Sequence, residues 1–309
     1  MHPTRRLIPA AALTALLLSL ATPGVAQPTP AAPQTHQFSR AQLKAAHLSL
    51  DKRLVKAPAG ITSWGEDPVS GRLVVSVVAS DQGAMAKAKA AVADVPAAQI
   101  KPVVERVRPY WNVIGGQAIF RSGARCSAGF NARDSAGIRY VLTAGHCTEL
   151  GGTWSGAGGT IGSVAGTAFP RDDYGRIRVS SSAAASTALV DRYSSGSDVT
   201  VAEAAIAVTG TAVCRSGSTT GWRCGSVTGV NQTVNYGGGD IVYGLTRTSA
   251  CAQPGDSGGS YVTNPGRGTG VNALGLLSGG SGNCSSGGTT FYQPISEVLS
   301  VYRLSLVTG

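Results

Sequence analysis

Two patterns of apolar and polar residues divide the chain near residue 113. In the first pattern, some segments repeat apolar residues at helical spacing and others contain short β-branched runs. The sequence Asp67-Pro68-Val69-Ser70-Gly71 has the composition of a hairpin turn. The predicted elements are a helix over residues 42–54, a hairpin over 61–80, a helix over 82–94 and a strand over 100–107. The first pattern therefore predicts a small α/β unit between about residues 38 and 112.

After residue 113, helical spacing almost disappears. Short β-branched runs such as Tyr140-Val141-Leu142 alternate with turns rich in glycine and serine, and 37 of the 42 glycines lie here. Many short strands with frequent turns predict an all-β barrel or sandwich, and only residues 295–304 have a helical pattern. A disordered low-complexity tail is the alternative for such a glycine content. The apolar runs and the six cysteines argue against that alternative.

The first 26 residues have the pattern of a secretory signal peptide. Arg5 and Arg6 precede an apolar run over residues 7–20, and small residues follow up to Ala26. A membrane anchor is the alternative, but a helix that spans a bilayer needs about 18 or more apolar residues. We therefore expect cleavage near Ala26 and a secreted, extracellular product that has no membrane association. Residues 27–37 are rich in proline and alanine and predict a flexible spacer.

The net charge of +10 does not by itself indicate a nucleic-acid partner. Residues 1–112 carry 13 basic and 6 acidic side chains, whereas residues 113–309 carry 13 arginines, no lysine and 10 acidic side chains. Most of the excess positive charge thus lies in the first part. The arginines of the second part are scattered rather than arranged in a basic stripe. We expect no nucleic-acid binding.

All six cysteines lie between Cys126 and Cys284, and an even number in an exported chain predicts disulfides. The number alone leaves the connectivity open, because six cysteines can pair in many ways. We favour bridges between sequence neighbours, namely Cys126–Cys147, Cys214–Cys224 and Cys251–Cys284. A metal site is the alternative, but the chain has no CxxC pair and no histidine cluster to build one. We therefore expect neither a metal nor another cofactor.

One serine and one histidine have the surroundings of catalytic residues. Ser257 lies in Gly255-Asp256-Ser257-Gly258-Gly259, where the glycines leave its hydroxyl accessible. A serine hydroxyl attacks a carbonyl only if a base takes its proton, and an imidazole has a suitable pKa. His146, next to Cys147, is the only histidine after His47. His146 is therefore the candidate base, with a purely structural histidine as the alternative.

Asp172 and Asp173 are adjacent candidates for the carboxylate that orients the imidazole. Neighbouring residues of an extended chain point in opposite directions, so at most one of them can face His146. Spacing alone does not say which one, and the other is expected to be a solvated loop charge. The order histidine, aspartate, serine is one of the known orders of a serine–histidine–aspartate triad.

The residues around Ser257 also predict how a reaction intermediate is stabilised. The N–H groups of Gly255 and Ser257 can converge on the oxyanion of a tetrahedral intermediate. Asp256 between them is expected to be buried and to need a cation. A Gly-Asp-Ser triplet alone is weak evidence, because another hydrolase class carries it near the N-terminus. Here the triplet lies late in the chain, after the histidine, which argues against that class.

Five motifs, in the same order, resemble those of the chymotrypsin-like serine proteases, and most closely the secreted bacterial branch that contains the streptogrisins and α-lytic protease. The motifs are Thr143-Ala144-Gly145-His146-Cys147, Asp173-Tyr174-Gly175, Cys214-Arg215-Ser216-Gly217, the segment around Ser257, and residues 275–294. This resemblance covers residues 113–309. Residues 38–107 are similar to the pro-segment of that branch, mainly through Trp64 and the hairpin over residues 67–78.

The resemblance implies two antiparallel six-stranded β-barrels, about 113–198 and 199–309, with the active site between them. Before them, residues 27–112 would be a spacer and an α/β pro-segment that is removed, leaving 113–309. The implied catalytic residues are His146, Asp173 and Ser257. The resemblance also implies that Arg215 pairs with Asp256 to hold the oxyanion hole, that Ser278 lies behind Asp173, and that residues 278–280 bind the substrate backbone as an added strand.

The same resemblance places the walls of a specificity pocket at residues 250–254, 278–280 and 289–291. The substrate-binding residues that it implies are Ala252, Pro254, Leu277, Ser278, Gly279, Gly280 and Thr290. No acidic residue and no histidine occurs in these walls, which favours large apolar side chains before the cleaved bond. Tyr110 and Trp111 are suitable sites for self-cleavage, with a new N-terminus anywhere from Trp111 to Gly115.

Together, these observations predict a secreted serine endopeptidase that is made as a self-processing zymogen and works as a monomer. Its expected partners are protein or peptide substrates and its own pro-segment, which would act as a folding chaperone and an inhibitor; a segment that only blocks the cleft is the alternative. A catalytically silent binding protein on the same fold is the alternative function. An esterase with the same triad is a third possibility.

Overall fold

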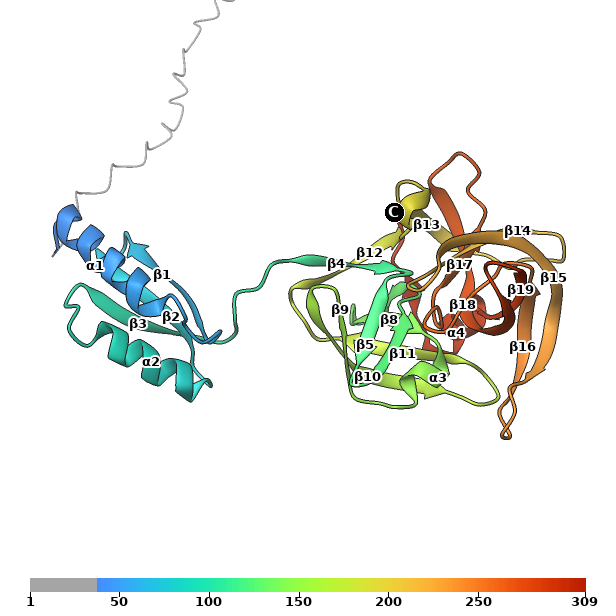
Figure 1. Cartoon of the computed structure of the whole chain (residues 1–309), viewed down its shortest axis with the longest axis horizontal. Coiled ribbons are helices and arrows are strands. Elements are labelled where there is room, and N and C mark those ends of the chain that lie inside the picture. The colour runs from blue at the N-terminus through green and yellow to red at the C-terminus, as the bar shows by residue number, and fades with distance from the viewer. Residues whose placement is uncertain (1–37) are drawn as a thin grey trace, which may run out of the picture. The chain divides into compact units, whose positions relative to one another are not determined.

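The computed structural model describes residues 38–309, which form two compact units divided between Val107 and Arg108 (Figure 1). The predicted signal peptide (1–26) and spacer (27–37) lie outside the described residues. Within residues 38–309, no helix combines the length and apolar character that crossing a bilayer requires.

The N-terminal unit is the predicted small α/β unit. Its elements are α1 (Arg40–Leu54), β1 (Ile61–Asp67), β2 (Arg72–Val78), α2 (Gln82–Val92) and β3 (Ala98–Val103). Helix α1 begins after Ser39, whose side chain and that of Gln42 form a capping box. Strand β2 lies in the middle of the sheet, antiparallel to β1 and parallel to β3. Both helices pack on the sheet face that carries Leu73, Val75 and Val77. The last strand begins two residues earlier and ends four residues earlier than the predicted range of 100–107.

The C-terminal unit consists mostly of strands, as the sequence predicts. Its strands are β4 (Trp111–Gly115), β5 (Ala118–Arg121), β6 (Ala124–Ser127), β7 (Asn131–Arg133), β8 (Arg139–Thr143), β9 (Thr153–Gly156), β10 (Gly159–Ala168), β11 (Tyr174–Val179), β12 (Ala184–Val190), β13 (Val199–Ala204), β14 (Ala212–Gly217), β15 (Gly221–Asn235), β16 (Ile241–Thr248), β17 (Ser260–Thr263), β18 (Gly270–Asn283), β19 (Gly287–Pro294) and β20 (Ser305–Leu306). They form one sheet of eight strands and one of nine. A 3₁₀ turn (Tyr193–Ser195) lies between β12 and β13.

The second sheet contains a closed barrel. Its strands follow the order β17-β14-β15-β16-β19-β18, and an additional pairing of β17 with β18 completes a ring of six (Figure 1). Closure of a sheet leaves no exposed edge, and the ring encloses a buried apolar cluster that includes Val213, Leu274 and Tyr292. The predicted six-stranded barrel is therefore present in this half of the unit.

The strand pairing extends beyond the two predicted barrels. The first sheet has eight strands, in the order β20-β7-β8-β11-β10-β9-β5-β6. Strands β4 and β12 join the second sheet, while the C-terminal β20 pairs with β7 of the first. Each end of this unit thus pairs with strands far away in the sequence. Such pairing satisfies edge N–H and C=O groups, and no local pattern signals it.

Two helices and three disulfides complete the C-terminal unit. Helix α4 (Ile295–Tyr302) lies where a helix was predicted, whereas the short α3 (Gly145–Thr148) was not expected. The disulfides join Cys126 to Cys147, Cys214 to Cys224 and Cys251 to Cys284, and no cysteine of the described residues is free. These are the pairs that the sequence analysis favours.

Candidate active site

His146 lies on α3, directly after strand β8 of the first sheet. The disulfide between Cys126 and Cys147 fixes this short helix to strand β6. A side chain at Gly145 would place its Cβ 2.0 Å from the carbonyl oxygen of Ala168, so only glycine lets the helix approach this segment so closely. The imidazole stays partly exposed, with 30% of its side-chain surface accessible. The local fold thus presents a fixed imidazole to solvent.

Asp173 is the carboxylate that contacts this imidazole. It lies just before β11, and its side chain is fully buried. Its Oδ2 is 2.9 Å from Nδ1 of His146, and its Oδ1 accepts a 2.9 Å hydrogen bond from the backbone N–H of His146. The Ser278 hydroxyl donates a further bond of 2.6 Å to Oδ2. The carboxylate therefore fixes the tautomer in which Nδ1 carries a proton and Nε2 is free to act as a base.

The surroundings of His146 shift its pKa in a direction suited to a base that must take a proton. Burial alone would lower the pKa of the imidazole, but the hydrogen bond and negative charge of Asp173, together with the charge of Glu149, outweigh it. The net result is a His146 pKa above its ordinary value. A carboxylate behind the ring stabilises the imidazolium that forms when the base is protonated.

Asp172 lies in the loop before β11, as expected, but is half-buried there. Burial and the negative charge of Asp172 raise the pKa of Glu297 on α4. Glu297 in turn accepts a 2.7 Å hydrogen bond from Nε2 of Gln293, and Oε1 of Gln293 accepts a 2.9 Å bond from the backbone N–H of Asp173. Gln293 is fully buried. It was not singled out in the sequence, because no motif marks an amide that binds a backbone 120 residues away.

Ser257 lies in a loop of the second sheet, between β16 and β17. Gly255 and Gly258 have φ angles of 97° and 80°, a backbone conformation that favours glycine, and they turn the chain on either side of the serine. The carbonyl oxygen of Ser257 accepts a 2.8 Å bond from the N–H of Ser127 on β6. By contrast, the N–H groups of Gly255 and Ser257 have no acceptor among residues 38–309. This loop thus offers two free N–H donors, as an oxyanion hole requires.

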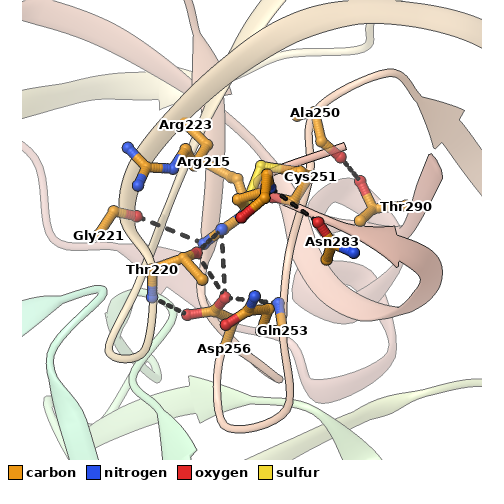
Figure 2. The surroundings of a disulfide bond; sticks show 12 residues. Arg215, Thr220, Gly221, Arg223, Ala250, Cys251, Gln253, Asp256, Asn283 and Thr290 are labelled. Atoms are coloured by element: carbon orange, nitrogen blue, oxygen red, sulfur yellow. Dashed lines mark hydrogen bonds and ion pairs between the residues drawn. A yellow bond between two sulfur atoms is a disulfide. The ribbon is translucent and has the colours of Figure 1, made fainter. Parts of the chain in front are cut away.

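Asp256 is held by a set of donors beneath this loop (Figure 2). Its carboxylate lies 3.2 Å from a guanidinium nitrogen of Arg215, and both side chains are fully buried. It also accepts hydrogen bonds from the backbone N–H groups of Thr219, Thr220 and Gln253. Arg215 donates to the carbonyl oxygen of Cys251 at 2.7 Å and to the Thr220 hydroxyl. The loop therefore has its own buried cation and needs no charged N-terminus to hold it.

Two adjoining hollows bring Ser257 and His146 into one groove, with Asp173 buried behind His146. A hollow of about 500 Å³ is lined by Ser257, Leu277 and the stretch from Gly279 to Gly282 on one wall. A second, of about 380 Å³, is lined by His146, Phe169, Tyr236 and Ser278, and it shares Gly279 and Gly280 with the first. No hydrogen bond joins the Ser257 hydroxyl to His146 among the residues that the structure describes. Catalytic hydrogen bonds of this kind are often long before a substrate binds.

Most of the predicted substrate-binding residues line these hollows. Ala252, Pro254, Leu277, Gly279 and Gly280 line the first hollow, and Ser278 lines the second. Gln253 also lines the first hollow and belongs to the predicted wall 250–254. The residues that the prediction missed are Ser281 and Gly282 in the first hollow, and Phe169, Tyr236 and Asp240 in the second.

Thr290 is the exception among the predicted substrate-binding residues. It is 1% exposed and lies behind the wall, where its hydroxyl donates a 2.6 Å bond to the carbonyl oxygen of Ala250. The prediction was wrong about its contact because it placed a whole stretch of strand β19 in the wall. Thr290 supports the wall instead of forming it.

Tyr236 connects the second hollow to the carboxylate of Asp173 through Ser278. Its hydroxyl is 2.8 Å from the Ser278 hydroxyl, which already donates to Asp173, so Tyr236 must donate to Ser278. Burial raises the pKa of Tyr236 to about 12, and the phenol therefore keeps its proton at neutral pH. Hydrogen bonds thus connect Tyr236, Ser278, Asp173 and His146 in one chain.

The edge of strand β18 beside the groove is open. Strand β18 pairs with β17 up to Leu276, and Leu277 makes the last backbone bonds on that side, to Gly258 and Gly259. From Gly279 to Asn283 the strand pairs only with β19, within the part of the chain that the structure describes. An unpaired edge of this kind can accept an extended peptide as an additional strand.

Comparisons with known proteins agree with this geometry. Residues 38–97 match the family model described as alpha-lytic protease prodomain, and residues 113–302 match the one described as trypsin. Streptogrisin-A of Streptomyces griseus is 45% identical over 249 residues, which cover 80% of this chain and 78% of the relative. The solved Nocardiopsis protease NAPase is 46% identical and covers 64% of this chain and 100% of its own, with a TM-score of 0.59. A solved glutamic-acid-specific serine protease that uses a histidine triad in substrate binding is 43% identical over 63% of this chain and 100% of its own, with a TM-score of 0.56.

Proposed function

Because the chain belongs to the trypsin family of serine proteases and carries an alpha-lytic protease prodomain, we propose that it is a secreted endopeptidase. Ser257 is the nucleophile, His146 the general base and Asp173 the residue that orients the base. The observation that carries this assignment is the pair of hydrogen bonds from His146 to the buried Asp173, which leaves Nε2 of the imidazole without a bond to the carboxylate.

The reaction follows from these positions. As the Ser257 oxygen attacks a substrate carbonyl carbon, Nε2 of His146 takes the hydroxyl proton, and Asp173 stabilises the imidazolium. His146 then gives this proton to the leaving amine, and an acyl-enzyme remains on Ser257. Water, activated by the same imidazole, hydrolyses the ester and restores the serine.

The free N–H groups of Gly255 and Ser257 supply the oxyanion hole for both tetrahedral intermediates. Loss of one such donor costs about 3 kcal/mol in related chemistry. These donors act without reorganisation because the buried pair of Arg215 and Asp256 already fixes the loop. The negative charge of the intermediate thus meets donors that are in place before the reaction.

The substrate backbone binds along the open edge of β18, as an antiparallel strand beside residues 278–280. This orientation places the side chain before the cleaved bond in the 500 Å³ hollow next to Ser257. Leu277, Ala252 and Pro254 give that hollow an apolar lining, and no acidic residue or histidine occurs in it. We therefore assign a preference for large apolar or aromatic residues at this position.

A preference for glutamate does not fit the groove. The glutamic-acid-specific relative uses a histidine triad in substrate binding, whereas residues 108–309 of this chain contain only one histidine, His146. His146 is already bound to Asp173. No residue that lines the first hollow carries a positive charge that could neutralise a glutamate side chain.

The chain is a precursor in this proposal. Residues 1–26 direct export, and residues 27–112 form the spacer and the prodomain, which assists folding, blocks the cleft and is then removed. Three disulfides in the catalytic unit and the matching prodomain support an extracellular zymogen. In this proposal the mature enzyme works as a monomer.

Labelling of Ser257 tests the proposal. Purified mature enzyme should react once with a radioactive sulfonyl fluoride, with the label on the peptide that contains Ser257, and should lose hydrolysis of peptide and ester substrates in parallel. Ser257→Ala should abolish both, whereas Ser300→Ala, an exposed serine on α4, should change neither. A protein that reacts with the label but, before labelling, cuts esters and not peptides would be an esterase. A protein that neither reacts nor cuts would be a silent binding protein.

A further inference from the structure

We propose that the segment Arg108-Pro109-Tyr110 is itself a substrate of this groove, and that the bond cut during maturation joins Tyr110 to Trp111. The inference rests on the proposed function and adds the sequence that the groove prefers. It narrows the new N-terminus to Trp111, the first position of the range from Trp111 to Gly115 that the sequence allows.

The residues before this bond are available to a protease. All residues from 104 to 110 are exposed and none belongs to a helix or strand, and Tyr110 exposes 84% of its surface. A bound substrate must be extended and must leave its own hydrogen bonds to pair with β18. This segment meets both conditions without unfolding either unit.

The residues after this bond are held in place. The N–H of Trp111 donates a 3.0 Å bond to the carbonyl oxygen of Ala183, and Trp111 pairs with Ala184 as β4 joins β12. The indole packs so tightly on Gly158 that a Cβ there would lie 2.1 Å from the ring.

The residues up to Val113 are also held in the fold, and the bonds after Trp111 and Asn112 are the next candidates for cleavage. Val113 is 2% exposed, and its carbonyl oxygen accepts bonds from Asn131 at 2.7 Å and Thr187 at 3.0 Å. A cut after Trp111 or Asn112 would therefore require strand β4 to detach from the sheet. The bond before Trp111 disturbs only the first residue of that strand.

The three residues also match the groove in order. The aromatic ring of Tyr110 suits the apolar hollow beside Ser257. In an antiparallel strand only alternate residues exchange hydrogen bonds with one neighbour, so Tyr110 and Arg108 would pair with β18 and Pro109 would need no N–H. The second hollow, beside His146, includes the carboxylate of Asp240, the only acidic side chain in either lining. Asp240 is available to attract the guanidinium of Arg108.

The chemistry of the cut is an ordinary hydrolysis. The Ser257 oxygen of an active copy bonds to the Tyr110 carbonyl carbon, the bond to the Trp111 nitrogen breaks, and His146 protonates that nitrogen. Water then cleaves the ester and leaves a carboxylate on Tyr110. The new ammonium of Trp111 still has protons to donate to the carbonyl oxygen of Ala183, so the cut sacrifices no hydrogen bond of the catalytic unit.

The test uses the full chain with Ser257→Ala, which cannot cut itself, as the substrate for a small amount of mature wild-type enzyme. N-terminal sequencing of the released fragment should read Trp-Asn-Val-Ile. A start at residue 112, 113, 114 or 115 would overturn the inference. So would an intact chain in the presence of enzyme that cuts a Tyr-containing test peptide, whereas an enzyme inactive on every peptide would overturn the proposed function instead.

Two substitutions in the same segment provide a matched comparison. Tyr110→Asp should slow the cut at least tenfold, because the apolar hollow rejects a charge, whereas Val107→Asp, at a position 74% exposed, should leave the rate within twofold. Equal rates for both variants would contradict the assignment.

A second experiment tests the attraction between Arg108 and Asp240. Wild-type enzyme should cut an Arg-Pro-Tyr peptide about two to five times faster than Gln-Pro-Tyr, and Asp240→Asn should remove the difference, as expected for a partly exposed ion pair. A ratio near one in the wild-type enzyme would exclude that role of Asp240.

Discussion

The two halves of the active site differ in how many of their polar groups are already satisfied. On the first sheet, Asp173 accepts from the backbone and ring of His146 and from Ser278. On the second sheet, the N–H groups of Gly255 and Ser257 have no acceptor within residues 38–309, and the β18 edge beside them is unpaired. The groups that must hold a position are bonded within the fold. The groups that must meet a substrate are left open.

Removal of either reacting side chain should have the largest effect. Ser257→Ala or His146→Ala should each lower kcat by about 10⁴-fold to 10⁶-fold, and the double variant should lose little more, because the two residues act as a unit. Steady-state kinetics on a chromogenic peptide measure this. Losses that multiply in the double variant would show that the two halves act independently.

Loss of the buried cation Arg215 should have the second largest effect. Arg215→Met leaves Asp256 as an unpaired buried charge and should destabilise the folded catalytic unit by about 3–5 kcal/mol. Arg223→Met, an exposed arginine on the neighbouring strand β15, is the matched control and should change the stability by less than about 0.5 kcal/mol. Urea unfolding followed by tryptophan fluorescence measures both. Equal stabilities would contradict the view that this pair holds the Ser257 loop.

Local patterns in the sequence anticipate much of this molecule. The helix at the C-terminus, the hairpin of the N-terminal unit and the three disulfide pairs are as predicted, because their signals lie within short stretches. The residues that line the first hollow were also mostly anticipated, through the resemblance around Ser257. Short-range spacing and a specific motif are enough for features of this kind.

The rest depends on contacts between distant segments. The strand exchange of β4, β12 and β20, the hydrogen bond from Asp173 to Gln293 and the contact of Tyr236 with Ser278 all join residues far apart in the chain. Nothing in the local composition marks Gln293 as a partner of a backbone N–H. Thr290 was misplaced for a related reason, since membership of a wall strand does not say which way a side chain faces.

Substitution of Gln293 should have a smaller effect, and it tests the half of the site around Asp173, whose polar groups are already hydrogen-bonded. Gln293→Leu would leave the buried N–H of Asp173 without its acceptor, at a cost of about 1–3 kcal/mol in stability. Because the carboxylate would be less well positioned, kcat should fall while KM stays within twofold. Glu297→Gln retains an oxygen that can accept from Gln293, and it should have the smaller effect on kcat. A change confined to KM would assign Gln293 to substrate binding instead.

The smallest expected effect concerns pH. Only neutral His146 can accept a proton, so its raised pKa should place the acid limb of kcat/KM above pH 6.5, the ordinary value. Glu149→Gln removes a charge that raises this pKa and should shift the limb slightly to lower pH, less so at high salt. The raised pKa also means that proton binding stabilises the fold below pH 6.5 and that this contribution is lost as the pH rises through the folded value. If the acid limb moved to higher pH in Glu149→Gln, the charge of Glu149 would lower the pKa of His146 instead of raising it, which would contradict this account.

The rate at which a sulfonyl fluoride inactivates the mature enzyme, measured against pH in wild type and in His146→Ala, tests the triad most directly. The account predicts that wild type is modified at Ser257 alone, with a rate that rises through a single midpoint above pH 6.5, and that His146→Ala reacts at least a thousandfold more slowly with no such midpoint. Rapid modification of Ser257 in His146→Ala, with an unchanged pH profile, would contradict it.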